Sequence, residues 1–211
     1  MQALGNFIHG AFVAPSGKPL ASRNPAADGA VVFETGTSVG AVGEAAAAAA
    51  AAQPAWARLT VAQRAEILER FKQAISARGE ALADAIVLET GKIRGEAKTE
   101  IQTLINRFDL ARAAVAAETT GSQVGPGEQL RYQALGVVGV IGPFNFPLHL
   151  CHAHVVPALL AGNTVVVKPS DLTPLCGQRY AEAALAAGFP PGVFNLVIGT
   201  GEVGARPASS R

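Results

Sequence analysis

The sequence predicts an α/β protein in which an N-terminal helical layer precedes part of a doubly wound parallel sheet. The first half of the chain carries apolar residues at helical spacing, whereas from position 136 onward short Val/Ile-rich runs alternate with helical segments. Continuous apolar runs of this kind are typical of parallel strands that are buried on both faces. Parallel strands joined by right-handed helical crossovers produce a doubly wound sheet, which binds ligands at the carboxyl ends of its strands.

The N-terminal residues predict a β-hairpin and a further strand. In FIHGAF, β-forming residues flank His9 and Gly10, and a Pro/Ser/Gly turn follows at 15–17. A second turn precedes a strand at 31–34. These short elements are expected to come before the helical layer.

Helices occupy the next part of the chain. The alanine-rich segment 44–53 has the highest helix propensity available and holds no side chain for chemistry. Thr60 opens a capping-box pattern for the following helix. Two more helices are expected at 80–90, with Gly91 as the C′ residue, and at 93–119. The apolar residues expected in the core of this layer are Ile67, Leu68, Phe71, Ile75, Leu82, Ile86, Leu88, Ile101, Leu104, Ile105, Phe108 and Leu110.

The second half of the chain alternates between strands and helices. A strand is expected at 129–133, before the Val/Ile-rich region begins. The parallel strands are then expected at 136–141, 164–168 and 193–198, and the helices between them at 148–161 and 172–188.

Composition excludes several classes of function. A formal net charge of +1 gives no electrostatic reason to expect nucleic acid or an anionic membrane as a partner. The sequence has neither a run of 18 apolar residues nor an N-terminal signal pattern. Its two cysteines make no disulfide framework. We therefore expect a soluble cytoplasmic protein.

The segment GPFNFP (142–147) lies at the carboxyl end of the first parallel strand. Pro147 suits the first position of the following helix, whose positive end favours nearby negative charge. An amide N–H of Asn145 held at this corner could donate to an oxyanion, and losing one such donor typically costs about 10²–10³ in rate. The residues alone leave open that Asn145 serves only turn chemistry.

Two further corners follow the next strands. In KPSD (168–171), Lys168 and Asp171 provide a donor and an acceptor suited to ribose hydroxyls, although a surface lysine and a carboxylate near a helix N-terminus give the same pattern. GTGEVG (199–204) satisfies G-x-G-x-x-G between a strand and a helix. The full dinucleotide fingerprint needs another strand and an acidic residue about 20 positions on, for which the chain has no room, so a pyrophosphate loop is disfavoured.

Together these segments resemble the N-terminal half of NAD(P)-dependent aldehyde dehydrogenases. The matching pieces, in family order, are FIHGAF, SRNPA, AWARL, LETGK, GVVGVIGPFNFP, VVPALLAGNTVVVKPSDLTP and GFPPGVFNLVIGTG. Within the family, TEIQTLINRFDLA and NFPLHLCHAHVVPALLAGN are most similar to the succinylglutamate semialdehyde dehydrogenases of arginine degradation. The resemblance implies a truncated aldehyde dehydrogenase fold with a Rossmann-like sheet.

The resemblance also implies a role for each corner. It assigns the Asn145 amide to the aldehyde oxygen as that oxygen becomes the oxyanion of a thiohemiacetal. Lys168 and Asp171 match positions that hold the adenosine ribose of NAD or NADP, but Asp171 is commonly Glu in relatives, which puts its reach to the hydroxyls in doubt. The remaining cofactor-binding residues implied in this way are Ile141, Gly142, Pro143, Phe144, Ser170 and Gly201.

Four segments follow from the same resemblance. Residues 1–118 form the hairpin and the helical part of the cofactor-binding domain. Residues 119–134 match an oligomerisation-type strand, and 135–204 match the first half of the dinucleotide-binding sheet. Residues 205–211 depart from the family pattern.

The sequence does not supply a full catalytic set. Oxidation of an aldehyde to a carboxylate in this family needs a nucleophilic cysteine and a glutamate base, which the resemblance places after the last residue of this chain. Cys151 and Cys176 fall within expected helices, where a buried cysteine is usually an inert hydrophobe. His149, His152 and His154 do not share one helix face, so packing is favoured over a metal site.

We therefore expect the chain alone to be inactive and its full-length parent to be a homo-oligomer that acts on a small aldehyde. The tail RPASSR suggests truncation by a frameshift, a premature stop or design, and Pro207 is expected to break the last helix early unless it falls in the first turn. Truncation would leave the edge of the VFNLVI strand and the faces of the sheet uncovered. Two alternatives stay open: a non-catalytic module that binds nucleotide or associates with full-length subunits, and an acylating reductase with the same fold.

Overall fold

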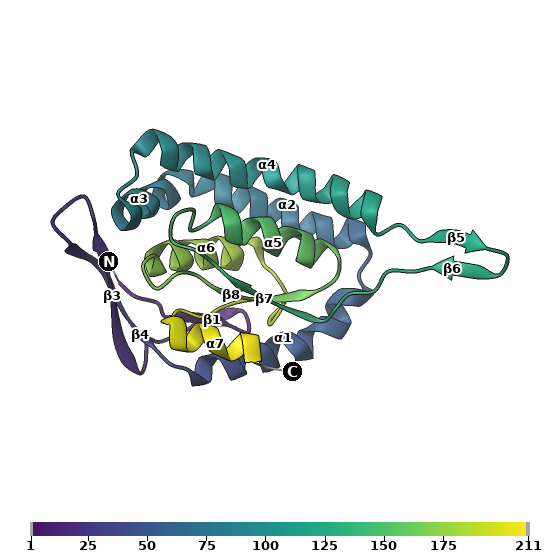
Figure 1. The fold of residues 1–211 in the computed structure, drawn as a ribbon, viewed down its shortest axis with the longest axis horizontal. Coiled ribbons are helices and arrows are strands. Elements are labelled where there is room, and N and C mark those ends of the chain that lie inside the picture. The colour runs from purple at the N-terminus through teal and green to yellow at the C-terminus, as the bar shows by residue number, and fades with distance from the viewer. Residues whose placement is uncertain (1, 210–211) are drawn as a thin grey trace.

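The computed structural model, which describes residues 2–209 with side chains through residue 205, has a central five-stranded sheet (Figure 1). In spatial order its strands are β2 (Ala11–Val13), β1 (Asn6–Ile8), β9 (Phe194–Leu196), β8 (Thr164–Lys168) and β7 (Val137–Ile141). β7, β8 and β9 run parallel, as predicted, whereas β1 is antiparallel to both β9 and β2. The N-terminal hairpin thus joins the C-terminal strands in one sheet, a long-range pairing that local sequence patterns do not reveal.

β7 forms one edge of this sheet, and β2 forms the other. β9 lies between β8 and β1, so the expectation that the VFNLVI strand would have an uncovered edge is wrong. β7 also departs from the buried pattern expected for it, because Val137, Gly139 and Ile141 are exposed while all five residues of β8 are buried. These three residues alternate along the strand and therefore share one face of it, and among the described residues no strand pairs with the outer edge of β7.

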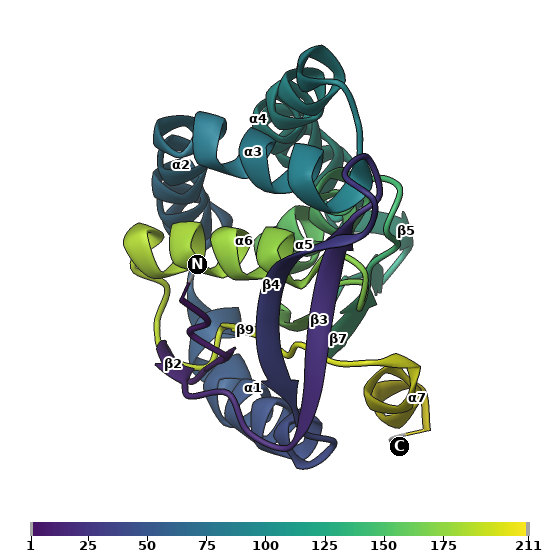
Figure 2. The same cartoon turned by 90° about the vertical axis from the view of Figure 1, so that its left-hand side faces the viewer.

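Helices cover both faces of the sheet, so the expectation that these faces would be uncovered is wrong (Figure 2). α5 (His149–Leu160) and α6 (Pro174–Ala187) lie on one face, and α1 (Gly40–Arg58) and α7 (Gly201–Ser209) lie on the other. An outer layer of α2 (Val61–Ala77), α3 (Gly79–Thr90) and α4 (Arg94–Glu118) packs over α5 and α6. None of the helices in residues 2–209 is long and apolar enough to cross a membrane.

Local sequence signals explain where several of these helices begin and end. The predicted capping box is present: the backbone N–H of Gln63 donates to Thr60 Oγ1, and the backbone N–H of Thr60 donates to the side-chain oxygen Oε1 of Gln63. Gly91 ends α3 with a φ of 72°, a conformation that glycine adopts without a Cβ penalty. α7 continues through Ser209, so the expectation that Pro207 would break it early is wrong. A proline removes only one backbone hydrogen bond from this short helix.

The alanine-rich helix α1 approaches the sheet closely. Ala45 and Ala49 are fully buried and pack with Val166 of β8 and with Val197, the residue directly after β9. The hydroxyl of Thr164 donates to the Ala49 carbonyl at 3.0 Å. Side chains no larger than a methyl group permit this approach, which accounts for the alanine run.

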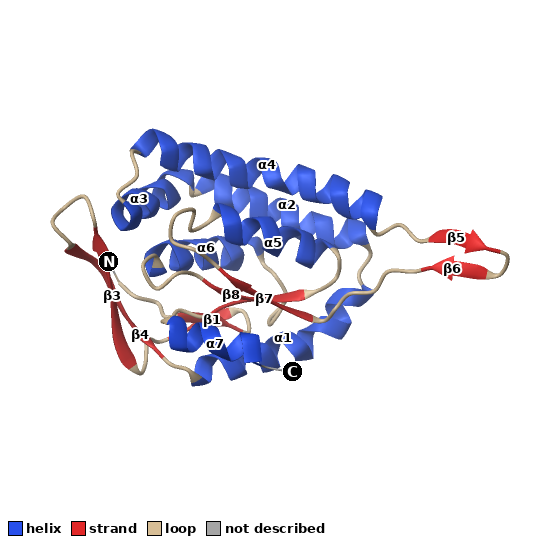
Figure 3. Cartoon of the chain, in the orientation of Figure 1, coloured by secondary structure: helices blue, strands red, loops and turns tan. Residues whose placement is uncertain are grey.

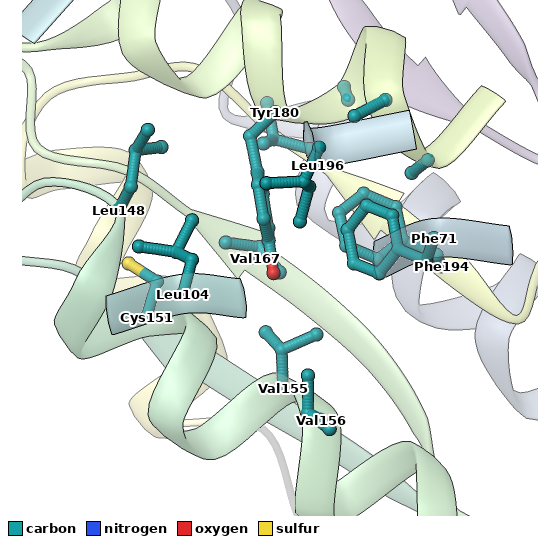
Figure 4. Close-up of a cluster of buried hydrophobic side chains, with 14 of the residues drawn as sticks. Phe71, Leu104, Leu148, Cys151, Val155, Val156, Val167, Tyr180, Phe194 and Leu196 are labelled. Carbon is teal, nitrogen blue, oxygen red and sulfur yellow. The ribbon is translucent and has the colours of Figure 1, made fainter. Parts of the chain in front are cut away.

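The main core lies between the sheet and the helices of the outer layer (Figure 4). Phe71 of α2 packs against Tyr180 of α6 and Phe194 of β9, with ring centroids 5.2 and 6.0 Å away. The predicted core residues of the outer helices are buried or half-buried, except that Leu110 is 61% exposed. Leu110 lies two positions after the buried Phe108, about 200° around the helix, which places it on the opposite face.

Two antiparallel hairpins extend from this body (Figure 3). β3 (Lys18–Asn24) pairs with β4 (Ala30–Thr37), which contains the strand predicted at 31–34. β5 (Ser122–Gly125) pairs with β6 (Glu128–Leu130), and this hairpin projects away from the helices. β6 begins one residue earlier and ends sooner than the predicted strand at 129–133.

Candidate functional site

The three corners singled out in the sequence meet around Lys168. Ile141 and Lys168 are register partners at the carboxyl ends of β7 and β8, and the Gly142 N–H donates to the Lys168 carbonyl at 2.8 Å. On the other side, a Cβ atom on Gly204 of α7 would lie 3.2 Å from Lys168 Cδ. GPFNFP, KPSD and GTGEVG therefore lie side by side at one rim of the sheet.

Lys168 is a buried cation at the centre of this rim. Only 5% of the residue is exposed, and Nζ donates to the Pro169 carbonyl at 2.7 Å. Burial lowers the pKa of Lys168, and the carboxylate of Asp171 acts in the opposite direction. Because Gly204 has no side chain, α7 can cover the aliphatic stem of the lysine.

The loop after Lys168 presents polar groups of both kinds. The Ser170 hydroxyl lies 3.4 Å from Asp171 Oδ1 and accepts the Leu172 N–H at 3.2 Å. Asp171 is half-buried, whereas Ser170 is buried. This loop thus combines a carboxylate acceptor with the ammonium donor that precedes it.

GTGEVG opens a helix after a strand, as predicted, since β9 ends at Leu196 and α7 begins at Gly201. Space in front of Gly201 is open, because a Cβ atom there would have no neighbour within 4 Å. At Gly199 the opposite holds, since a Cβ atom would collide with Val203 of α7. The first glycine is needed for packing, and the second leaves room for a ligand.

The GPFNFP corner places Asn145 at the surface. Asn145 is exposed, and among the described residues its side chain makes no hydrogen bond. Phe144 and Phe146 on either side are 55% and 43% exposed. The corner is anchored beneath by Gly142, where a Cβ atom would overlap Cys151 Sγ of α5. Packing thus requires glycine at 142 and leaves the side-chain amide of Asn145, three residues later, without a hydrogen-bond partner among the described residues.

The helix after this corner begins later than predicted, and its N-terminal amides are occupied. Pro147 lies in a turn, and α5 starts at His149, so Pro147 does not take the first helical position. The N–H groups of Leu148 and His149 both donate to Glu100 Oε1 of α4 at 3.1 Å. The helix end predicted to favour a ligand anion therefore holds a protein carboxylate instead.

Sequence reasoning missed Glu100, its partner Lys92 and Glu89. Glu100 Oε2 accepts from Lys92 Nζ at 2.9 Å, and Lys92 Nζ lies 3.6 Å from the centre of the Phe146 ring. A signal was present: Glu100 precedes Leu104 by four residues, on the apolar face of α4, where a charged residue needs a buried partner.

The two cysteines are placed as inert core residues. Cys151 is 3% exposed, and burial raises the pKa of its thiol to about 12. Cys176 is fully buried, and burial with the nearby Glu89 raises the pKa of its thiol well above the ordinary value. Neither thiol forms a thiolate near pH 7, so neither provides the nucleophile.

The three clustered histidines have different surroundings. His152 is fully buried with Nδ1 2.8 Å from the Tyr180 hydroxyl, His149 is half-buried, and His154 is exposed. Within residues 2–209 no group of three or more His, Cys, Asp or Glu side chains is placed to hold a metal ion. Packing accounts for His152.

Comparison with known proteins gives one consistent family. The family model described as the aldehyde dehydrogenase family matches residues 12–209. The N-succinylglutamate 5-semialdehyde dehydrogenase from Chromobacterium violaceum is 40% identical over 201 residues, which are 94% of this chain and 41% of that enzyme. The enzyme of the same name from Burkholderia cenocepacia is 42% identical over 208 residues, which are 97% of this chain and 43% of that enzyme. The chain therefore spans about two fifths of the length of the curated relatives it matches.

Solved structures agree with these relatives. A mutant of aldehyde dehydrogenase C from Pseudomonas syringae, in complex with NAD+ and octanal, superposes with a TM-score of 0.90 at 38% identity and covers 96% of this chain and 42% of its own. Lactaldehyde dehydrogenase from Escherichia coli superposes with a TM-score of 0.88 at 36% identity, over 95% of this chain and 43% of its own. An E. coli NADP-dependent enzyme superposes with a TM-score of 0.91 at 31% identity, over 98% of this chain and 44% of its own.

Proposed function

The chain belongs to the aldehyde dehydrogenase family, and we propose that it forms the cofactor-side part of an enzyme that oxidises an aldehyde to a carboxylate with NAD or NADP. The observation that carries this proposal is the convergence of the ends of β7, β8 and β9 around Lys168. Ligands of doubly wound sheets bind at this rim. The nucleotide accepts a hydride when bound, and the residues of this chain bind and orient it.

The residues at the rim fit an adenosine ribose. Lys168 Nζ uses one of its N–H groups on the Pro169 carbonyl, so two remain for ribose hydroxyls. Asp171 is half-buried and supplies the acceptor, and Gly201 leaves open space beside it. The backbone from Ile141 to Phe144, together with Ser170, lines the slot in this proposal. The ammonium group tolerates a ribose hydroxyl or a 2′-phosphate, so it does not select between NAD and NADP.

Asn145 is assigned to the aldehyde oxygen. A thiolate that attacks the aldehyde carbon turns this oxygen into an oxyanion, and the amide N–H of Asn145 donates to it. The exposure of Asn145 and its lack of a partner among the described residues leave the donor available. The thiolate must come from outside this chain, because burial keeps both of its cysteines protonated. We therefore expect residues 1–211 alone to be inactive.

The substrate is proposed from the names of the relatives. Both curated relatives described above are N-succinylglutamate 5-semialdehyde dehydrogenases, which supports this aldehyde and a place in arginine catabolism. Two unpaired cysteines are consistent with the reducing cytoplasm. The projecting β5–β6 hairpin exposes Val124 and Leu130, which supports a homo-oligomer of the full-length enzyme joined through residues 119–134.

Calorimetric titration of residues 1–211 with NAD+ tests the cofactor role. Lys168→Met keeps the stem under α7 but removes the ammonium, so we expect about tenfold weaker binding, as for the loss of a hydrogen bond to a charged group. Lys72→Met, on the remote helix α2, is the matched control. Equal affinity in the two variants would refute the assignment of Lys168.

Two further measurements address catalysis and the second candidate function. A measurable aldehyde-dependent rise in NADH with residues 1–211 would overturn the expected inactivity. Among the described residues the outer edge of β7 is unpaired, and this edge together with the exposed β5–β6 hairpin favours the alternative of a non-catalytic fragment that associates with full-length subunits. Co-purification with a full-length relative, in the absence of NAD+ binding, is the result expected for that alternative.

A further inference from the structure

Two buried glutamates from the outer helical layer reach the two helices that follow the site corners. Glu100 of α4 is 3% exposed and Glu89 of α3 is 4% exposed. Each carboxylate meets the first amides of a helix that covers the sheet, Glu100 at α5 and Glu89 at α6. The same arrangement therefore occurs twice, once at each corner next to Lys168.

Glu100 fixes the end of the Asn145 corner. Its Oε1 accepts the N–H groups of Leu148 and His149, and these amides lie three and four residues after Asn145. A carboxylate at a helix N-terminus satisfies orphan donors and interacts favourably with the helix dipole. The first turn of α5 is thereby tied to α4, in a place where the helix has no capping side chain of its own.

Lys92 connects the same carboxylate to the middle of the corner. Its Nζ donates to Glu100 Oε2 at 2.9 Å and lies 3.6 Å from the centre of the Phe146 ring. A cation over an aromatic face is held by the ring quadrupole. Phe146 is the residue directly after Asn145, so the corner is restrained on the β7 side by Gly142 and on the α5 side by Lys92 and Glu100.

Glu89 holds the second corner in the same way. Its two oxygens accept the N–H groups of Leu175 at 2.9 Å and of Cys176 at 2.8 Å, at the start of α6. Here too the helix has no side-chain cap of its own, since Thr173 makes none. The loop that follows Lys168 and carries Asp171 ends at this point.

We propose that Glu100 and Glu89 are positioning residues, Glu100 for the Asn145 corner and Glu89 for the Lys168–Asp171 corner. Each carboxylate sets where a crossover helix begins and therefore how the loop between strand and helix leaves the sheet. The proposal rests on the functions assigned above to Asn145, Lys168 and Asp171. It predicts that the two corners respond separately to the two glutamates.

Amide hydrogen exchange of ¹⁵N-labelled residues 1–211, followed by NMR, tests this separation. In Glu100→Ala we expect the Leu148 and His149 amides to exchange about tenfold faster, which equals about 1.4 kcal/mol, while the Leu175 and Cys176 amides are unchanged. Glu89→Ala should give the reverse pattern. Glu96→Ala is the matched control, because Glu96 is an exposed carboxylate one turn earlier on α4.

A conservative variant and a spectroscopic signal complete the test. Glu100→Gln keeps an acceptor oxygen for the α5 amides but loses the charge facing Lys92, so we expect about threefold faster exchange. This variant also carries the test if the alanine variant does not fold. The side-chain amide signals of Asn145, identified by their loss in Asn145→Ala, should shift in the Glu100 variants and stay in place in Glu89→Ala and Glu96→Ala.

The outcomes separate this inference from the function on which it rests. Unchanged exchange at the matching corner, or equal acceleration at both corners in each variant, would overturn the positioning role whatever the affinity for NAD+. Corner-specific acceleration with weaker NAD+ binding in Glu89→Ala supports both. Corner-specific acceleration with no measurable NAD+ binding by the unsubstituted chain supports the positioning role and counts against the cofactor assignment.

Discussion

His152 predicts a strong dependence of stability on pH. The imidazole is fully buried between α4, α5 and α6, 4.7 Å from the Phe108 ring centre and hydrogen-bonded through Nδ1 to Tyr180. Burial lowers the pKa of His152 to about 3; the backbone of Leu104 acts in the opposite direction, and the smaller effects of His149 and Arg107 also lower the pKa. A protonated ring in this position would place an uncompensated charge in the core.

The sign and size of the effect follow from this pKa. The folded ring stays neutral down to about pH 3, whereas in the unfolded chain the same ring takes up a proton below about pH 6.5. The unfolded state therefore binds more protons as the pH falls, and stability that is present above pH 6.5 is lost between pH 6.5 and 3. Between pH 7 and pH 5 the loss from His152 alone is about 2 kcal/mol.

Urea unfolding followed by the fluorescence of Trp56, the single tryptophan, measures this loss. His152→Gln removes the titrating group and keeps a polar partner for Tyr180, so it should lose about 2 kcal/mol less than the unsubstituted chain between pH 7 and pH 5. His154→Gln is the control, because His154 is exposed on the same helix. Identical losses in the unsubstituted chain and in His152→Gln would refute the reasoning.

Three other predictions concern packing and the cysteines. Gly142→Ala should lower the free energy of unfolding by about 1–3 kcal/mol, because its methyl group overlaps Cys151 Sγ. Adding Cys151→Ala to the same chain should recover part of this loss. The control Gly95→Ala, where a Cβ atom meets open space, should not destabilise the chain, and urea titration measures all three variants. Thr60→Ala should cost about 1 kcal/mol through loss of the capping box, with the exposed Ser76→Ala as control in the same assay. Both thiols should resist alkylation at pH 7.5 in the folded chain and react in urea, as mass spectrometry would show; rapid labelling of the folded chain would contradict the assigned burial.

Much of the fold could be predicted because its signals are local. The β8 strand was placed at its observed bounds, since an uninterrupted Val run before the first charge, Lys168, has few other interpretations. The capping box at Thr60 and the left-handed Gly91 are likewise determined by neighbouring residues. These signals also fixed the order of strands and helices, from which the parallel pairing of β7 with β8 follows.

The errors concern relations between distant residues. No residue near Phe7 in the sequence indicates that Phe7 pairs with Leu196. Without this pairing, the local sequence patterns predict that β9 is an edge strand. The Asn145 corner shows the same limit. Sequence patterns located the corner itself, but its supports come from Lys92 and Glu100, which precede it by more than 40 positions on α4 and its approach. Their spacing from the corner carries no local signal.

These supports change the electrostatic description of the proposed oxyanion site. From the sequence alone, the positive end of α5 would have attracted negative charge, but Glu100 already occupies the Leu148 and His149 amides and offsets that potential. At this corner the uncharged side-chain amide of Asn145 is a donor left available among the described residues. An uncharged donor binds a neutral carbonyl oxygen weakly and an oxyanion more strongly, because hydrogen bonds to charged acceptors are stronger. A site built in this way would favour the charge that develops during the reaction over anions present beforehand, which is the difference that accelerates a chemical step.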